Sequence, residues 1–149
     1  MNKKSKFGLE LIDSKEKTKK VQDIFSSVAM NYDLMNDLMS LGTHRLWKHR
    51  FFQIVKLGES ENLLDIASGT GDVAIHFARS FKRIHLTCLD ANEKMLSVAK
   101  ERFINSGIIK NVNFVAEPIE SFVDENSFTT ATIAFGFRNC TNQQKSLEN

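Results

Sequence analysis

The chain has 149 residues, of which 42% are hydrophobic and 26% charged, and its formal net charge is +2. This composition suffices for the core of one globular domain. No long apolar run indicates a membrane span or an export signal, and the two cysteines lack CxxC spacing, so we expect a cytoplasmic protein. The four histidines lack the spacing of metal ligands, and we expect no metal site.

The first twenty residues are rich in lysine, with seven lysines against three acidic residues. We expect residues 1–20 to form a basic, mobile tail. Such a tail would attract an anionic surface. Its lysines do not alternate with aromatic residues, so nucleic acid is not an expected partner.

Residues 21–58 are expected to form an N-terminal helical segment. An amphipathic helix is predicted by apolar residues at helical spacing, namely Val21, Ile24, Phe25 and Val28. A second helical stretch carries Leu34, Met35, Leu38 and Met39 in phase. After the break at Gly42, Thr43 is the expected N-cap of a third helix that continues until Gly58.

Residues 59–149 alternate between strand and helix patterns, which predicts an α/β domain. Short apolar runs predict strands at 63–67, 84–89, 112–116 and 129–135. Helices are expected at 72–81, at 93–105 after an Asn92 cap, and from Thr141 or Asn142 onward. Strand, helix and strand in succession form a parallel sheet, so we expect about four parallel strands with flanking helices.

A glycine-containing loop, Ser68-Gly69-Thr70-Gly71, follows the first of these strands. Gly69 and Gly71 permit a tight turn and a close approach of ligand to backbone. The loop and the residues after it also satisfy the GxGxxG/A pattern, and Asp90 lies near the distance expected for a ribose-binding acid. The loop alone is therefore compatible with a dinucleotide.

Two acidic residues favour S-adenosylmethionine instead. Asp65 lies inside the apolar strand, where a carboxylate costs desolvation unless a cation such as the methionine ammonium pairs with it. Asp90 ends the next strand and is expected to accept hydrogen bonds from both ribose hydroxyls. The alternatives are a buried Asp65 paired with a loop amide, and an Asp90 that serves as a turn acid or helix cap.

A longer motif precedes the glycine loop. The stretch from Tyr32 to Trp47 matches YDxMNxxxSxxxHxxW at every specified position and resembles the N-terminal signature of the ubiquinone/menaquinone biosynthesis C-methyltransferase family. The similarity continues through residues 64–72, 90–96 and 132–139, and covers the chain from about Val21 onward.

This resemblance implies methylation of a ring carbon of a prenylated benzoquinol or naphthoquinol, with S-adenosylmethionine as cofactor. It also implies a Rossmann-like class I methyltransferase fold with an N-terminal helical lid. The glycine loop and Thr70 would hold the methionine end of the cofactor, Asp90 the ribose, and the Pro118–Ile119 region the adenine. Where the family has Asn or Asp before Ala-Glu, this chain reads Glu117-Pro118-Ile119-Glu120, so either Glu117 or Pro118 occupies the adenine-contact position.

The family fold has seven strands in the order 3-2-1-4-5-7-6, and the Arg-Val-Leu-Lys-Pro-Gly-Gly-like run that opens the fifth strand is absent here. We therefore expect an incomplete fold whose fourth strand is an aggregation-prone edge. Two alternatives to an active methyltransferase follow, a truncated remnant that retains at most cofactor binding and a dinucleotide-binding module.

No catalytic base is assigned, although Tyr32, His44 and Arg138 are the polar candidates nearest the expected pocket. A prenyl chain resides in the bilayer, so peripheral membrane contact is an expectation, to which the lysine tail and the Val21–Val28 helix would contribute. The sequence indicates no particular oligomeric state.

Overall fold

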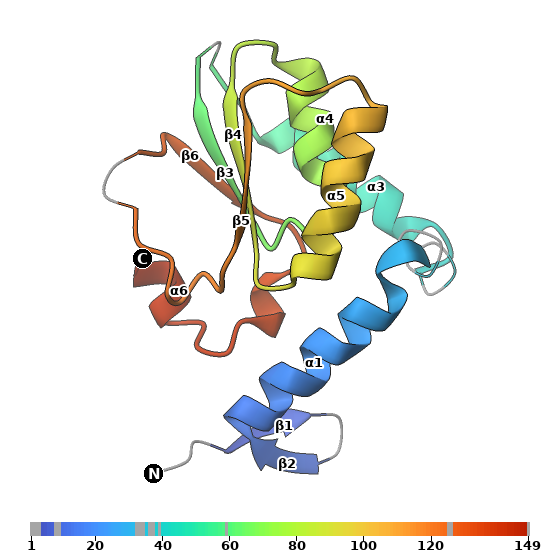
Figure 1. The fold of residues 1–149 in the computed structure, drawn as a ribbon, viewed down its shortest axis with the longest axis vertical. Helices are drawn as coiled ribbons and strands as arrows, with labels where there is room; N and C mark the ends of the chain where they lie inside the picture. Colours follow the sequence, from blue (N-terminus) through green and yellow to red (C-terminus); the bar gives the residue numbers. More distant parts are fainter. Residues whose placement is uncertain are drawn as a thin grey trace.

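The computed structural model describes residues 4–7, 10–31, 35, 38, 40–58, 60–124 and 127–148. Its centre is a four-stranded parallel sheet, which confirms the expected α/β fold (Figure 1). The strands follow the order β5-β4-β3-β6, which is the 3-2-1-4 order implied by the resemblance. Their bounds are Asn62–Ile66 for β3, His85–Asp90 for β4, Val112–Ala116 for β5 and Thr130–Ile133 for β6.

The register of the sheet brings polar side chains toward its carboxyl edge. Asp65 on β3 lies opposite Cys88 on β4 and Thr132 on β6. Asp90 is the last residue of β4 and pairs with Ala116. Because the strands are parallel, the loops that follow them meet at this one edge, where ligands bind in open α/β sheets.

One face of the sheet is covered by helices. These are α3 (Thr43–Ile54), α4 (Asp72–Ser80) and α5 (Glu93–Asn105), and Figure 1 shows α4 and α5 beside each other on this face. The core between sheet and helices includes Leu63, Leu86, Phe77 and Phe103, with Phe51 and Phe52 of α3 packed against it. Asn92 caps α5 as the sequence predicts, since its side chain accepts from the N–H groups of Lys94 and Met95.

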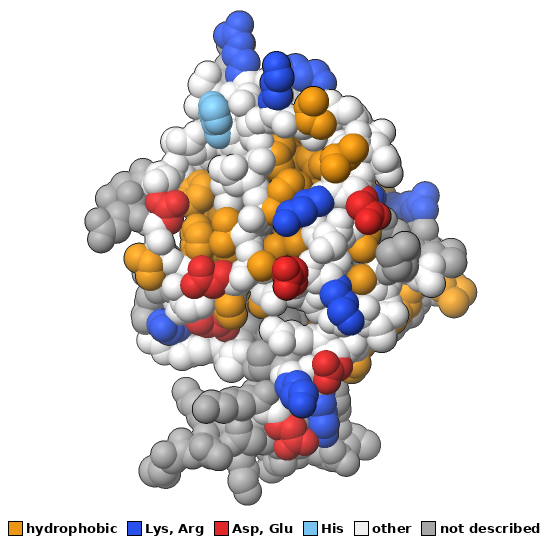
Figure 2. Space-filling model, viewed as in Figure 1, with side chains coloured by type: hydrophobic (Ala, Val, Ile, Leu, Met, Phe, Trp, Pro, Cys, Tyr) orange, Lys and Arg blue, Asp and Glu red, His pale blue; other side chains and the backbone are white. Residues whose placement is uncertain are grey.

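The opposite face is covered by loop segments that follow β5 and β6. Leu64, Leu89 and Ile119 form a small buried cluster here, and partly buried side chains surround it, namely Ile66, Val115, Phe122, Phe128 and Cys140. Hydrophobic side chains are visible over the sheet in the left half of Figure 2. This face is therefore less completely buried than the helical one.

The N-terminal region contains more regular structure than the sequence analysis predicts. β1 (Lys4–Phe7) and β2 (Glu10–Asp13) form an antiparallel hairpin, which leads into α1 (Ser14–Val28) and a 3-10 turn, η1 (Ala29–Asn31). The helix begins at Ser14 rather than at Val21, so a boundary at residue 20 falls inside it. Glu16 in its first turn pairs with Lys20 one turn later at 3.0 Å, and both the pair and the acid near the N-terminus favour the helix.

The asparagine that caps α5 also attaches α1 to the rest of the molecule. The Asn92 side chain is only 8% exposed, and its amide donates to the Gln22 carbonyl at 3.0 Å and the Ser26 hydroxyl at 2.9 Å. In Figure 1, α1 runs obliquely below the sheet and its helices, with the hairpin at its lower end.

Four local predictions differ from the structure. Helix α3 ends at Ile54 rather than at Gly58, since Val55 has an extended backbone. Gly42, in the left-handed region at φ 77, takes the N-cap position of α3 that was expected for Thr43, and the Thr43 hydroxyl donates to the Ser40 carbonyl instead. β6 ends at Ile133 rather than at Phe135, because Phe135 itself has a left-handed backbone (φ 63) that terminates an extended strand. The helix expected from residue 141 or 142 is reduced to α6 (Lys145–Glu148), after a second 3-10 turn, η2 (Phe137–Asn139).

Leu34 and Met39 of the expected second helix lie outside the described residues. Within the part of the chain that is described, no helix is both long and apolar enough to cross a membrane.

Candidate functional site

The glycine loop connects β3 to α4 at the carboxyl edge of the sheet. Gly69 and Gly71 both have left-handed backbones, with φ values of 55 and 77. A Cβ at Gly71 would lie 3.1 Å from both the Ala99 Cβ and the Phe103 ring, so the glycine also permits close packing of α5. The loop is therefore shaped by conformational and by steric requirements at once.

Asp90 fixes the position of this loop. One carboxylate oxygen accepts a hydrogen bond from the Gly69 N–H at 2.8 Å, and the other accepts from the Asn92 N–H at 2.8 Å. Burial raises the pKa of Asp90, while these two bonds oppose the rise. Each oxygen retains a further acceptor position, so the turn-acid role and the expected contact with a ribose are compatible.

Asp65 is the most deeply buried acid of the site, with 1% of its surface exposed. Its carboxylate accepts from the hydroxyls of Ser68 at 2.9 Å and Thr132 at 2.8 Å, so its partners are neutral hydroxyls rather than the loop amide of the alternative interpretation. Burial, with a smaller contribution from Asp90, raises the pKa of Asp65 to about 6. A negative charge is thus held beside the glycine loop with little compensation.

A second network links the loop to two helices. Lys48 of α3 donates to Asp72 at 2.5 Å, and Arg102 of α5 approaches the other Asp72 oxygen at 3.3 Å. Arg102 also donates to the Thr70 hydroxyl at 2.9 Å and to the Thr70 carbonyl at 3.1 Å. Burial alone would raise the pKa of Asp72, but Lys48 and Arg102 hold it below its ordinary value.

The second network has no signal in the sequence beyond Asp72. No local pattern identifies Lys48 or Arg102 as partners of the loop, because they lie 24 and 30 residues from Asp72 along the chain. Asp72 alone carried a signal, since it follows the glycine loop in the motif that runs from residue 64 to residue 72.

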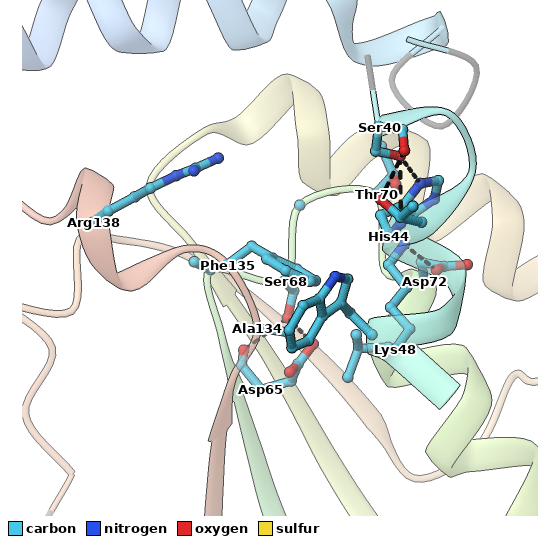
Figure 3. Close-up of a pocket in the computed structure, with 15 residues that line it drawn as sticks. Ser40, His44, Lys48, Asp65, Ser68, Thr70, Asp72, Ala134, Phe135 and Arg138 are labelled. Atoms are coloured by element: carbon cyan, nitrogen blue, oxygen red, sulfur yellow. Dashed lines mark hydrogen bonds and ion pairs between the residues drawn. The ribbon is translucent and has the colours of Figure 1, made fainter. Parts of the chain in front are cut away.

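A cavity of about 410 Å³ opens beside these groups. Three parts of the chain contribute lining residues: the first turns of α3 with Ser40 before them, the end of β3 with the glycine loop and the start of α4, and the segment after β6 with Arg138. Figure 3 shows Asp65 and Ser68 at the strand end, with Lys48 and His44 on the α3 side and Arg138 on the opposite side. Ala67 and Phe135, which also line the cavity, have left-handed backbones at φ 53 and φ 63. Such conformations in non-glycine residues are typical of functional sites.

The structure brings together only part of the predicted cofactor site in this cavity. Asp65, Gly69 and Thr70 line it, whereas Gly71 packs against α5 and Asp90, which accepts from the Gly69 N–H, is not among the lining residues. The adenine-side residues follow β5, where the Glu117 N–H donates to the Asp90 carbonyl at 3.1 Å.

This adenine-side segment presents different groups at its successive positions. Pro118 is exposed and Glu117 partly exposed, but the Ile119 side chain is 8% exposed and packs on Leu64 and Leu89. Glu120 accepts from the N–H groups of Thr141 at 2.6 Å and Asn142 at 3.1 Å, so it ties the segment to the C-terminal region.

Two of the three polar candidates for catalysis line the cavity, and the third, Tyr32, lies outside the described residues. His44 Nδ1 is 2.9 Å from the Ser40 hydroxyl, and this bond orients the ring at the start of α3. Arg138 belongs to η2, on the other side of the cavity (Figure 3). Within the described ranges, no group of three His, Cys, Asp or Glu side chains is placed to hold a metal ion.

The sequence of the chain is similar to that of a known protein family. Residues 13–149 match the ubiE/COQ5 methyltransferase family. The chain is 42% identical to the ubiquinone/menaquinone biosynthesis C-methyltransferase UbiE of Hydrogenovibrio crunogenus over 144 residues, and 46% identical to that of Rickettsia bellii over 148 residues. These alignments cover 95% of this chain but 57% and 59% of the two relatives.

Solved structures are similar at the level of the fold. A putative S-adenosyl-L-methionine-dependent methyltransferase from Methanococcus maripaludis aligns with a TM-score of 0.68 at 13% identity, covering 83% of this chain and 56% of that one. A SAM-dependent methyltransferase from Aquifex aeolicus gives 0.61 at 21% identity, covering 68% and 54%. The Rossmann-like methyltransferase fold expected from the sequence is therefore confirmed.

Proposed function

The chain belongs to the ubiE/COQ5 methyltransferase family, and we propose that it binds S-adenosylmethionine and takes part in C-methylation of a prenylated benzoquinol or naphthoquinol. Cofactor binding and methyl transfer are separate parts of this proposal. The reason is that the chain spans 57–59% of the length of the curated relatives it matches.

The buried Asp65 carboxylate supports the cofactor most strongly. It lines the cavity, and its two hydrogen-bond partners are neutral hydroxyls. An ammonium group in the cavity would supply the missing positive charge and remove much of the cost of burying this acid. The methionine end of S-adenosylmethionine carries such a group. In a dinucleotide site, by contrast, a buried carboxylate next to the loop would repel the pyrophosphate.

The remaining contacts with the cofactor would be made by residues at the carboxyl edge of the sheet. Asp90 has acceptor positions for ribose hydroxyls beyond its bonds to Gly69 and Asn92. Thr70 would contact the methionine end, and the Pro118–Ile119 segment would contact the adenine. Since the Ile119 side chain is buried, this segment would offer its backbone and the Glu117 carboxylate.

When bound, S-adenosylmethionine supplies an electrophilic methyl group on a sulfonium. The protein then needs to orient the quinol, exclude water and take up a proton, because a ring carbon becomes nucleophilic when a neighbouring hydroxyl ionises. Of the two polar side chains on opposite sides of the cavity, His44 carries an imidazole, which has a nitrogen lone pair that can accept a proton, and Arg138 carries a guanidinium, which only donates hydrogen bonds. His44 is therefore the better candidate for the proton acceptor, with Arg138 facing the developing phenolate.

The prenyl chain of such a substrate partitions into lipid, so we place the reaction at the cytoplasmic surface of a membrane. Both cysteines are free thiols, which suits a reducing compartment.

Label transfer tests the proposal. Incubation of the purified chain with methyl-labelled S-adenosylmethionine and a short-chain prenylated benzoquinol should label the quinol. Asp90→Asn should reduce the transfer, while Asp124→Asn, a change at an exposed carboxylate, should not. Folded protein that binds the cofactor but transfers no label would restrict the function to cofactor binding, and preferential binding of NAD would support the dinucleotide alternative.

A further inference from the structure

The outer side of α3 carries several large apolar side chains that are exposed. Leu46, Trp47 and Ile54 are 70%, 65% and 69% exposed. With Arg50 they share one side of the helix, because positions three, four and eight residues apart lie close to one face. Phe52 lies on the opposite side and Phe51 at the border of the exposed side, and both pack against the core. We call the exposed set Leu46, Trp47, Arg50 and Ile54 the α3 surface.

Two further leucines extend this apolar character beyond the helix. Leu38 and Leu41 lie just before α3 and are 76% and 89% exposed. Soluble chains expose single apolar residues routinely, but a set of five around one short helix is unusual and indicates an interaction site.

The charged residues of α3 and of the short segments on either side of it, within residues 40–57, have one sign. Residues 40–57 contain Arg45, Lys48, Arg50 and Lys56 and no aspartate or glutamate. Lys48 pairs with Asp72. The residues Arg45, Arg50 and Lys56 are exposed, and Arg50 donates to the Gln53 side chain at 3.2 Å. Apolar side chains with tryptophan among them, flanked by basic residues, are typical of helices that lie in the interface of an anionic bilayer.

The α3 surface is also continuous with the cavity. Trp47 is 65% exposed and yet lines the cavity, together with Ser40, Thr43, His44 and Lys48 from the same region. A molecule that enters the cavity past α3 therefore passes the apolar side chains of this surface.

We propose that the α3 surface docks the protein on a membrane containing anionic lipid, with Leu46, Trp47 and Ile54 at the level of the headgroups and upper acyl chains and Arg50 against the phosphates. The choice of a membrane as partner rests on the proposed function, whose substrate has a prenyl chain. The surface itself rests on exposure and charge alone. Docking in this orientation would turn the cavity entrance toward the lipid that contains the substrate.

Trp47 is the only tryptophan of the chain, so its fluorescence reports on the α3 surface directly. The full chain is mixed with vesicles of phosphatidylcholine and phosphatidylglycerol, or of phosphatidylcholine alone, without cofactor or quinol. We expect the Trp47 emission to shift to the blue and to be quenched by brominated lipid with the anionic vesicles. Binding should weaken as salt is added.

Matched variants distinguish binding through the α3 surface from nonspecific binding to vesicles. Leu46→Glu and Ile54→Glu should each weaken vesicle binding by about tenfold, since each replaces an inserted apolar group by a charge repelled by the lipid. Ile104→Glu on α5, where the side chain is 64% exposed, should leave binding unchanged. Arg50→Gln should reduce binding and its dependence on salt. Circular dichroism checks that each variant is folded.

Three results would overturn the docking proposal. The first is an unshifted Trp47 emission when folded protein is mixed with anionic vesicles. The second is a loss of binding in Ile104→Glu equal to that in Leu46→Glu. The third is self-association without vesicles that Leu46→Glu abolishes, because the partner would then be a second copy of the chain. Calorimetry of S-adenosylmethionine with the same samples keeps the two proposals distinguishable. A chain that binds cofactor but no vesicles contradicts the docking alone, and one that binds vesicles but no cofactor contradicts the proposed function alone.

Discussion

Asp65 places a carboxylate inside the sheet with two hydroxyl donors from Ser68 and Thr132 and no positive partner among them. Its pKa rises from the ordinary value of 3.8 to about 6, chiefly because of burial. The folded state therefore holds a proton that the unfolded chain releases between about pH 4 and pH 6. In this interval the free energy of unfolding decreases as pH rises, by roughly 3 kcal/mol in total.

Asp65→Asn removes the free-energy cost of ionising a buried carboxyl group. The free energy of unfolding should increase by about 1–3 kcal/mol at about pH 7.5 and change little at about pH 4, where the native carboxyl is already neutral. Urea unfolding at the two pH values measures the difference. An equal change at both pH values would show that burial of the charge is not the cause.

The same ionisation should control cofactor affinity. In the wild type, binding of S-adenosylmethionine should weaken as pH falls from about 7 to about 5, because Asp65 becomes protonated and loses its attraction for the ammonium group. Asp65→Asn should bind more weakly at neutral pH and show a flatter profile. Calorimetry across this range tests the assignment, and parallel profiles for the two proteins would contradict it.

Gly136 is required by a contact rather than by its backbone angles. An added Cβ would lie 2.3 Å from the Ala67 Cβ, so the end of β6 and the start of the glycine loop touch at this point. Ala67 already has a left-handed backbone, and its position leaves little room for adjustment.

Gly136→Ala should therefore lower the free energy of unfolding by about 1–3 kcal/mol, a typical cost of overpacking, and should enlarge or distort the cavity. Gly58→Ala is the control, because its nearest neighbour is the end of the flexible Glu61 side chain at 3.0 Å. Chemical denaturation of the two variants gives the comparison. Equal stabilities would show that the contact relaxes without cost.

Sequence patterns reveal the two key acids for a simple reason. An acid inside an apolar strand, such as Asp65, and an acid at the end of the next strand, such as Asp90, are local features. The bonds from Lys48 to Asp72 and from Arg102 to Thr70 join residues 24 and 32 positions apart, and no local pattern specifies them. Likewise, the packing of Ile119 in the core becomes visible only once the sheet is assembled.

Helix α3 is attached to the rest of the site by both apolar and ionic contacts. Phe51 and Phe52 pack on Phe77 of α4, and Lys48 pairs with Asp72 at the start of the same helix. The Lys48 and Asp72 side chains are 15% and 40% exposed, so solvent screening limits the contribution of this pair.

Lys48→Met should lower the free energy of unfolding by no more than about 1 kcal/mol but should increase hydrogen exchange over residues 43–54. The effect on exchange should be greatest at low salt. Lys20→Met, which removes the more exposed pair with Glu16, should leave exchange of α3 unaltered. Unchanged α3 exchange in Lys48→Met would mean that the two phenylalanines alone hold the helix.

Element boundaries follow from sequence where a local signal is strong. The strand predicted at 112–116 and the helix predicted at 93–105 agree with β5 and α5. The ends of α5 are defined by the Asn92 cap and by Gly107 at φ 70. The start of α1 was predicted wrongly, because its first turn is polar and has no apolar periodicity. The end of β6 was missed because its cause is the left-handed backbone of Phe135.

The order of strands in the sheet has a consequence for the molecule as a whole. In the described part of the chain, β6 pairs with β3 along one side only. Its residues Thr130–Ile133 carry no charge, and Ala131 is exposed. An uncharged edge strand of this kind favours pairing with another chain.

Ala131→Lys should therefore reduce self-association of the protein at high concentration, as measured by light scattering. Asn113→Lys places the same charge on the opposite edge, at an exposed position of β5, and should have a smaller effect. If both variants associate like the wild type, β6 is not the contact.

The most direct measurement is calorimetric titration of the folded chain with S-adenosylmethionine. A parallel titration with NAD tests the dinucleotide alternative. We expect one binding site per chain, no heat from NAD, and a loss of affinity of about tenfold in Asp90→Asn, corresponding to one lost charge-assisted hydrogen bond. A flat titration of protein that is shown to be folded would contradict the assignment of this edge of the sheet as a methyltransferase cofactor site.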